Sequence, residues 1–153
     1  MSEPWVLTEP PPPGIRETYG PAPSQHVWIR RPPGTERLRT LAMIHGGYWR
    51  AAYDAGHVGH LCADLVRRGW ATVALEYRRI GEDGGAWPGT LTDVSAALDS
   101  LQGLAGKHRL DLDRARKAGD DIRLVMPEDA DHFDVIDPKS KAWAQVVDAI
   151  GTP

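Results

Sequence analysis

The sequence predicts an α/β fold with a mainly parallel sheet of about four to five strands flanked by helices. Three observations support this prediction. Two near-continuous apolar runs, at 38–45 and 70–79, have the pattern of strands buried on both faces. An amphipathic segment at 54–68 lies between them, which makes a βαβ unit with a right-handed crossover. A further apolar run at 121–128 and a further amphipathic segment at 140–150 continue the alternation of strand and helix.

Composition limits the class of protein. The chain has 153 residues, of which 41% are hydrophobic and 25% charged, as in a single globular domain. The net charge of −3 gives no basic footprint for nucleic acid or for an anionic membrane, so we expect neither as a partner.

The cellular compartment is predicted from cysteine usage and from the N-terminal segment. A single cysteine, Cys62, excludes an internal disulfide and indicates a reducing environment. The opening "MSEPWVLTEPPPPG" has neither the basic nor the apolar region of a signal peptide. No apolar run approaches the roughly 18 residues that a membrane span needs. We therefore expect a cytoplasmic protein.

The chain divides into a proline-rich arm over 1–23 and a single domain over 24–153. "PPPPG" cannot form a helix or an internal strand, so the arm is expected to be extended. Residues 26–32 alternate in polarity and predict an edge strand. The helix over 54–68 carries one apolar face and ends at Gly69, a typical helix C-terminal glycine. That face comprises Val58, Leu61, Cys62, Leu65 and Val66.

A glycine-rich loop at 80–89 leads into a predicted helix over 90–104. Thr90 and Asp93 have the spacing of an N-terminal capping arrangement. The buried stripe of this helix is predicted to comprise Leu91, Val94, Leu98 and Leu101. The last helix, over 140–150, is predicted to bury Trp143, Val146, Val147 and Ile150.

The stretch "MIHGGYWR" places His45 where a buried strand meets Gly46 and Gly47. One interpretation is a tight turn whose histidine bonds only to the backbone. The functional alternative is an oxyanion hole, because small residues let a substrate carbonyl approach backbone donors. Tyr48 and Trp49 would then form the wall of a pocket.

His132 lies just beyond the strand predicted at 121–128. Ligands of open α/β sheets bind beyond the carboxyl ends of the strands, so His45 and His132 are candidates for one crevice. The alternative is a solvated loop histidine among acids, which include Asp131 and Asp134.

Metal binding is considered at two places and not favoured at either. His57 and His60 share a helix face, but Cys62 belongs to the apolar stripe and a site needs three or four convergent ligands. An acidic run lacks the glycine and the glutamate of a calcium loop, and a solvated turn is preferred. That run comprises Asp129, Asp131, Asp134 and Asp137.

Five motifs together resemble the α/β-hydrolase superfamily. They are "MIHGGYWRAAYD", "RRGWATVALEYRRIG", "GGAWPGTLTDVSAALDSL", "LDLDR" and "ADHFDVIDPKSKAW". The likeness runs from about Ser24 to Ile150 and is strongest to the bacterial kynurenine formamidase and small-esterase branch, which has an HGG-x-W oxyanion motif.

The resemblance implies hydrolysis of an ester or amide of a small molecule by a Ser–Asp–His triad, with no cofactor or metal. It matches Gly46, Gly47 and Tyr48 to the oxyanion turn, with His45 and Trp49 beside them. It also matches His132 to the catalytic base.

The chain departs from this family at the nucleophile. In the family, a segment like "LDLDR" leads into a strand that ends in the G-x-S-x-G elbow, whereas here 110–114 runs directly into "ARKAGDD". No residue matches the triad aspartate. None of the serines lies in such an elbow; they are Ser2, Ser24, Ser95, Ser100 and Ser140. The chain therefore resembles a truncated α/β-hydrolase fold with an internal deletion.

This pattern predicts a strand order of 26–32, 70–79, 38–45 and 121–128, with room for an extra N-terminal edge strand. The strand at 121–128 would be an exposed edge through which a second copy could bind. Without a nucleophile, we expect the chain to be inactive or very weakly active alone. His132, oriented by Asp134 or Asp131, could at most activate water weakly. The alternative is a non-catalytic remnant or a dimerising or binding module.

Overall fold

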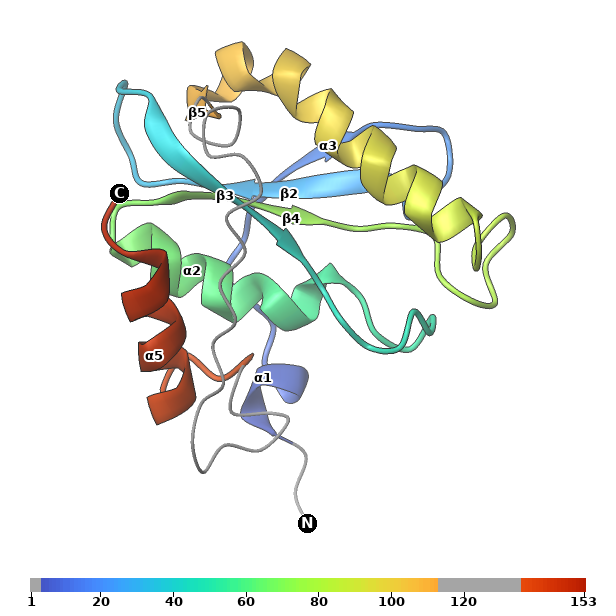
Figure 1. Cartoon of the computed structure of the whole chain (residues 1–153), viewed down its shortest axis with the longest axis horizontal. Helices are drawn as coiled ribbons and strands as arrows, with labels where there is room; N and C mark the ends of the chain where they lie inside the picture. Colours follow the sequence, from blue (N-terminus) through green and yellow to red (C-terminus); the bar gives the residue numbers. More distant parts are fainter. Residues whose placement is uncertain (1–3, 113–135) are drawn as a thin grey trace.

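The computed structural model describes residues 4–112 and 136–153, and its centre is a five-stranded mixed sheet (Figure 1). The strands lie in the order β1-β2-β4-β3-β5. Their bounds are Ile15–Thr18 for β1, His26–Arg30 for β2, Leu38–Ile44 for β3, Ala71–Leu75 for β4 and Leu110–Asp111 for β5. The predicted fold class, a truncated α/β-hydrolase sheet flanked by helices, is confirmed.

The parallel pair β3–β4 forms the middle of the sheet. Its register pairs Thr40 with Ala71 and Ile44 with Leu75, so both strands end at the same edge. All five residues of β4 are buried, as expected for an apolar run covered on both faces. The predicted neighbours, 26–32 beside 70–79 and 70–79 beside 38–45, are confirmed.

The outer strands differ in part from expectation. Residues 26–32 do not form an edge, because β1 pairs with β2 on its outer side and supplies the extra N-terminal strand. On the far side, β5 pairs with β3 only at Leu38 and Arg39. The predicted strand 121–128 and its position beside 38–45 lie outside the described residues.

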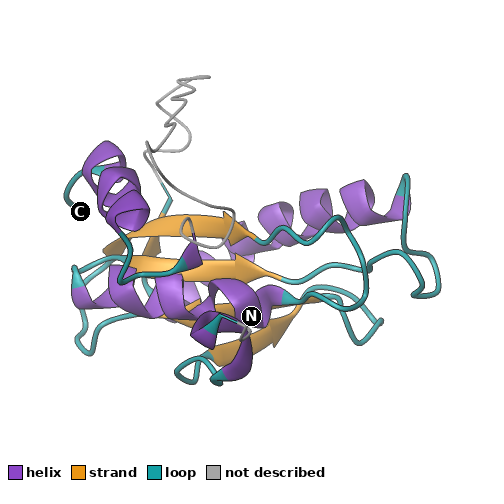
Figure 2. Ribbon diagram, turned by 90° about the horizontal axis from the view of Figure 1, so that it is seen from below, coloured by secondary structure: helices purple, strands orange, loops and turns teal. Residues whose placement is uncertain are grey.

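Helices cover both faces of the sheet (Figures 1 and 2). α3 lies on one face, and α2 and α5 lie on the other. The proline-rich arm contains a one-turn helix, α1, before β1. The bounds are Trp5–Thr8 for α1, Ala55–Val58 for a 3₁₀ turn, Gly59–Arg67 for α2, Gly89–His108 for α3 and Lys141–Ile150 for α5.

The segment 54–68 is helical as predicted, with a 3₁₀ first turn. Asp54 caps this turn by accepting a hydrogen bond from the backbone N–H of Gly56. The helix ends at Gly69, whose φ of +95° lies in the region that only glycine adopts without strain. The N–H groups of Gly69 and Trp70 donate back to the last helical turn, which confirms the predicted C-terminal glycine.

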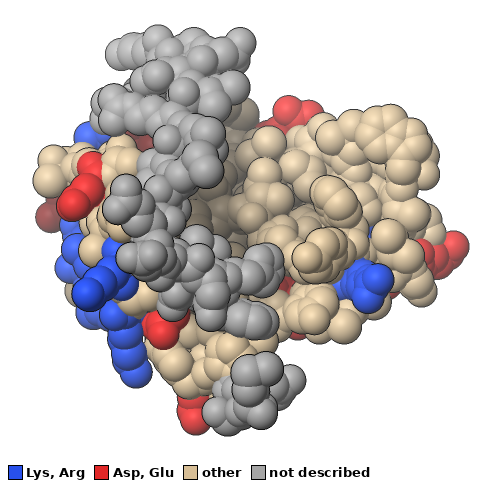
Figure 3. All heavy atoms as spheres, turned by 60° about the horizontal axis from the view of Figure 1, so that its bottom comes forward, with Lys and Arg blue, Asp and Glu red and all other residues tan. Residues whose placement is uncertain are grey.

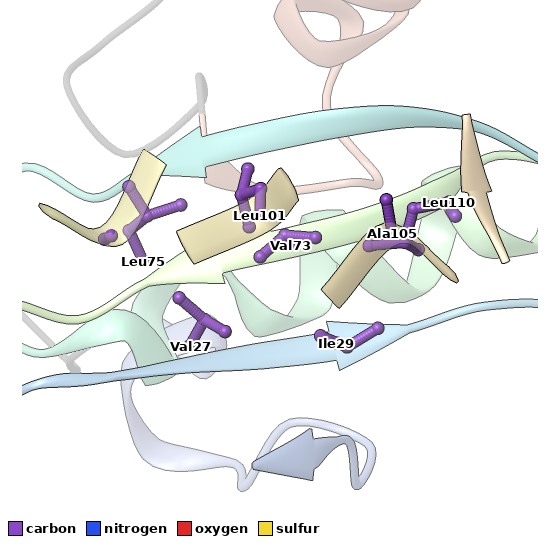
Figure 4. Packing of buried hydrophobic residues seen from close by; sticks show 9 residues of the cluster. Val27, Ile29, Val73, Leu75, Leu101, Ala105 and Leu110 are labelled. Atoms are coloured by element: carbon purple, nitrogen blue, oxygen red, sulfur yellow. The ribbon is translucent and has the colours of Figure 1, made fainter. Parts of the chain in front are cut away.

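Two apolar clusters stabilise the two faces. On the α3 face, Leu101 and Ala105 pack over residues of β2, β4 and β5 (Figure 4). On the opposite face, α2 and Trp70 pack with Trp143 of α5. The predicted apolar face of the last helix is confirmed, because Val146, Val147 and Ile150 pack against this second cluster. Ser140 caps α5 by accepting a hydrogen bond from the backbone N–H of Trp143.

The buried face of α3 agrees with the predicted stripe at Val94 and Leu101 but differs from it at Leu91 and Leu98. Leu91 and Leu98 are 51% and 40% exposed, whereas Asp93 and Ala97 are almost fully buried. The cause is polar: the Asp93 carboxylate accepts hydrogen bonds from the Arg78 backbone and guanidinium and from Gln25. These bonds orient the helix so that the i, i+4 series from Asp93 faces the sheet.

The predicted capping role of Thr90 and Asp93 is also wrong. Pro88 occupies the N-cap position without a side-chain cap. The Thr90 hydroxyl instead donates to the Arg78 carbonyl at 2.7 Å. Both residues attach the first turn of α3 to the segment that follows β4.

The α3 orientation predicts unequal effects for one substitution at two positions. Leu101→Ala removes a buried side chain and should lower the free energy of unfolding by about 2–5 kcal/mol. The matched control Leu91→Ala, at an exposed position of the same helix, should change it by less than about 0.5 kcal/mol. Urea denaturation followed by circular dichroism measures both. Equal losses in the two variants would contradict this orientation.

Candidate active site

The β3–β4 register brings two polar residues together at the carboxyl edge of the sheet. Ile44 pairs with Leu75, so the residues that follow the two strands, His45 and Glu76, are neighbours. His45 Nε2 lies 3.0 Å from Glu76 Oε1, and both side chains are almost fully buried. Open α/β sheets bind their ligands at this edge.

The His45 ring lies beneath the turn and positions it. Its Nδ1 donates to the Gly46 carbonyl at 2.9 Å, while Nε2 faces the Glu76 carboxylate. The Tyr77 ring stacks on the imidazole at a centroid distance of 4.3 Å, and its hydroxyl donates to the His45 carbonyl. Burial raises the pKa of Tyr77 to about 12, so this hydroxyl keeps its proton at neutral pH.

Glu76 connects the turn to the rest of the domain. Besides His45, its carboxylate accepts hydrogen bonds from the backbone N–H groups of Ala55 and Tyr77, at 2.8 and 3.0 Å. Arg79 Nε lies 3.7 Å from Glu76 Oε1. Burial alone would raise the pKa of Glu76, but these hydrogen bonds hold it below its ordinary value. The group is therefore a buried carboxylate fixed by several donors.

The turn itself has an unusual backbone. Gly47 has φ of +104°, and a Cβ added there would lie 2.4 Å from Tyr53 Cβ, so only glycine fits. Tyr48 and Trp49 follow with φ of +55° and +57°, a region that bulky residues rarely adopt. The Arg50 N–H closes the turn on the Gly47 carbonyl. Such strain is common at functional sites.

This turn leaves backbone donors available. Within residues 4–112 and 136–153, no acceptor lies in hydrogen-bond reach of the N–H groups of Gly46, Gly47 or Tyr48. A Cβ added at Gly46 would meet no atom of the described residues within 4 Å, so they leave the space beside it open. Neighbouring N–H groups at an open turn can stabilise a developing oxyanion.

The far end of the turn is attached to the loop after β4. The Ile80 N–H donates to the Trp49 carbonyl at 2.6 Å, and Arg50 and Ile80 form an isolated parallel bridge. Arg79 also donates to the Tyr53 carbonyl. Tyr48 and Trp49 are thus restrained on one side by His45 and on the other by the loop after β4.

Aromatic side chains surround the turn at the surface. Tyr48 and Trp49 are 71% and 59% exposed, and Trp87 of the neighbouring loop is 81% exposed. In Figure 3, the right-hand side of the molecule, which carries the loops after β3 and β4, is mostly uncharged. Exposed aromatic side chains therefore belong to the turn itself, at Tyr48 and Trp49.

The described serines have structural roles or lie on helices. Ser140 caps α5, Ser100 donates to the Ala97 carbonyl within α3, and Ser24 donates to Glu82. Ser95 is exposed on α3. The predicted base His132, with Asp131 and Asp134, lies outside the described residues, as does Ser2.

Sequence reasoning missed Glu76 and Tyr77. One signal in the sequence could have revealed Glu76. It directly follows the apolar residues of β4, just as His45 directly follows those of β3, and the two strands are parallel. In-register parallel strands make such residues neighbours.

Two further features concern metal binding and membrane insertion. Among the residues described, no three His, Cys, Asp or Glu side chains are placed to hold a metal ion. The same residues include no helix of the length and apolarity that crossing a membrane requires.

The fold is that of the α/β-hydrolase superfamily. The solved structure of MGS-M1, an alpha/beta hydrolase enzyme from a Medee basin deep-sea metagenome library, matches 64% of this chain with a TM-score of 0.52 at 15% identity. That match covers 42% of MGS-M1. More particularly, the chain belongs to the BD-FAE family, whose model matches residues 29–120.

Two relatives carry esterase names. The chain is 34% identical over 82 residues to the probable carboxylic ester hydrolase LipM of Mycobacterium tuberculosis, which covers 52% of this chain and 18% of LipM. The inhibited esterase B of Lactobacillus rhamnosis matches with a TM-score of 0.51 and 27% identity, covering 69% of this chain and 35% of the esterase. The chain thus spans well under half the length of each relative.

Two glycines of the turn should respond differently to the same substitution. Gly47→Ala introduces a Cβ that clashes with Tyr53 at a positive φ, and should lower the free energy of unfolding by about 1–3 kcal/mol. Gly46→Ala meets open space and should cost about 1 kcal/mol or less. Thermal and urea denaturation compare them, and a Gly46→Ala variant as unstable as Gly47→Ala would contradict the described turn.

Glu76 should make stability depend on pH. Because its pKa in the folded protein lies below its ordinary value of 4.5, its contribution is complete above that value and is lost as the pH falls toward the folded pKa. Glu76→Gln should lower the free energy of unfolding by about 1–3 kcal/mol at pH 7 and flatten the decline below pH 5. Urea denaturation across this pH range measures both effects.

The matched control for this experiment is Glu36→Gln, at an exposed position. It should preserve both the stability at pH 7 and the acid decline. A Glu76→Gln variant with the wild-type pH profile would show that Glu76 does not contribute to it.

Proposed function

We propose that this chain carries the oxyanion-binding turn of a carboxylic ester or amide hydrolase. The observation that carries the proposal is the set of three available backbone N–H groups at Gly46, Gly47 and Tyr48, beside open space. In acyl transfer, negative charge develops on the substrate carbonyl oxygen, and preorganised backbone donors stabilise it. His45 and Glu76 hold these donors in place before substrate arrives.

The proposed substrate is a small ester or amide with an apolar or aromatic part. Exposed Tyr48 and Trp49, which belong to the turn, provide aromatic surface next to the donors. The "HGGYW" sequence is similar to the oxyanion motif of the bacterial kynurenine formamidases and small esterases. The esterase names of LipM and esterase B agree with this class of substrate.

The proposed mechanism lacks a nucleophile within this chain. Acyl transfer in this superfamily needs a serine hydroxyl activated by a histidine. No serine of the sequence lies in a G-x-S-x-G elbow, as expected if the segment between Arg114 and Ala115 has been lost. His132 is the proposed base. An oxyanion turn and a base without a serine leave the isolated chain inactive or very weakly active.

Activity measurements test the missing nucleophile. We expect a fluorophosphonate probe to label no specific serine of the purified chain. Hydrolysis of p-nitrophenyl acetate should equal that of the His132→Ala variant and stay at background, because no activated hydroxyl attacks the ester. Labelling of one serine that His132→Ala abolishes would overturn this part of the proposal.

A separate measurement tests the oxyanion turn. Methylphosphonate presents charged oxygens similar to those of a tetrahedral intermediate, so it should shift the amide NMR signals of Gly46, Gly47 and Tyr48 in a saturable way. Sodium chloride at equal ionic strength is the control and should leave them in place. Unchanged signals at saturating methylphosphonate would overturn the assignment of this turn.

A further inference from the structure

A polar cavity lies on the outer part of the sheet at β1 and β2, and Glu76 and Arg79 of the candidate active site are also among its lining residues. β1 and β2 are antiparallel, with Arg16 paired to Trp28. Residues directly opposite each other project from the same face, and alternate residues of a strand do too. Arg16, Trp28 and Arg30 therefore share one face. Val27 and Ile29 project from the other face, into the cluster beneath α3.

The proline-rich arm and this face line a cavity that is open to solvent. The cavity has a volume of about 560 Å³, within the range of small-molecule sites. Its apolar wall is formed by proline rings and an indole. Its charged lining residues are three arginines and three acids, namely Arg16, Arg30, Arg79, Asp54, Glu76 and Glu82. The lining residues that matter here are Pro11, Pro12, Pro13, Arg16, Trp28 and Arg30.

Arg30 is buried in this wall with an unused donor. Only 8% of the residue is exposed, and its Nε donates to the Pro12 carbonyl at 3.0 Å. Its Nη1 is buried without a hydrogen-bond partner in the described part of the chain. Burial lowers the pKa of Arg30, since no carboxylate lies beside it to offset the cost. A buried cationic donor without a partner requires an explanation.

The acids that line the same cavity are already engaged. Arg79 bonds to Glu82 and approaches Glu76. These contacts, with a bond from Ser24, hold the pKa of Glu82 at about 2 although partial burial would raise it. Asp54 accepts the cap hydrogen bond from Gly56. The three arginines and three acids of the whole lining balance in formal charge. Among the described residues, however, no ion pair involves Arg16 or Arg30, whereas Arg79 lies beside Glu76 and Glu82, so the unpaired guanidinium groups belong to β1 and β2.

We propose that this cavity binds a small organic carboxylate. The carboxylate accepts hydrogen bonds from the Arg30 guanidinium, and the apolar body lies between the proline rings and Trp28. Planar, charged donors of arginine suit a carboxylate, and an apolar wall favours a ligand with a hydrocarbon part over inorganic phosphate. Arg30 pairs with Thr72 near the start of β4, whereas the oxyanion turn lies beyond the end of that strand. This proposal does not depend on hydrolase activity.

Isothermal titration calorimetry with benzoate tests the proposal on the full chain. Wild-type protein should bind benzoate saturably at one site, and should bind benzyl alcohol or inorganic phosphate at least tenfold more weakly. Arg30→Met keeps the apolar stem but removes the charge, and should weaken benzoate binding at least tenfold. The matched control Arg37→Met, at an exposed position outside the cavity, should bind as wild type does.

Arg16→Gln provides a second variant if Arg30→Met does not fold. Arg16 lies at the exposed side of the cavity, so its loss should leave the fold intact and weaken benzoate binding several-fold. Three results would overturn the proposal: no saturable benzoate binding to wild type, equal affinity for benzoate and benzyl alcohol, or tighter binding of phosphate than of benzoate. If wild type binds no benzoate, water is the hydrogen-bond partner of Arg30 Nη1.

Discussion

The carboxylate of Glu76 is the interaction on which the candidate active site depends. Three groups contact this carboxylate. They are the His45 side chain after β3, the backbone N–H of Ala55 at the start of the helical segment 55–67, and the backbone N–H of Tyr77. Three separate parts of the βαβ unit therefore meet at one group. Because the carboxylate is buried, loss of any donor leaves charge without compensation, and each part restrains the others.

The strained turn is explained by this restraint. Tyr48 and Trp49 adopt backbone conformations that cost about 1–3 kcal/mol each, and such conformations persist only where the surroundings determine them. The surroundings here are the His45 ring on one side and the Ile80 hydrogen bond on the other. The result is a set of N–H groups without a hydrogen-bond partner among residues 4–112 and 136–153. The same arrangement in a relaxed loop would lose these donors to local turns.

The sequence predicted the elements that depend on apolar periodicity and turn chemistry. The runs ending near Ile44 and Leu75 gave correct parallel strands, and Gly69 marked the end of a helix, because these features are local. The face of α3 was predicted correctly at Val94 and Leu101 and wrongly at Leu91 and Leu98. The difference arises because Asp93 is buried by partners at positions 25 and 78 that periodicity does not reveal. The glycines of the sequence indicated a turn after His45, and the structure has one there. The contact between Glu76 and His45 could not be predicted in this way. It depends on the register of β3 and β4, which is known only when the two strands are placed side by side.

The contact between α5 and α2 has a consequence for the nascent chain. The Trp143 indole donates to Asp64, whose carboxylate also binds Arg67 and Arg68 at the end of α2. Burial alone would raise the pKa of Asp64, but these donors keep it below its ordinary value. During synthesis, α2 and Trp70 emerge some seventy residues before Trp143. Their apolar surface therefore remains uncovered on the ribosome for that interval, when chaperones can recognise it.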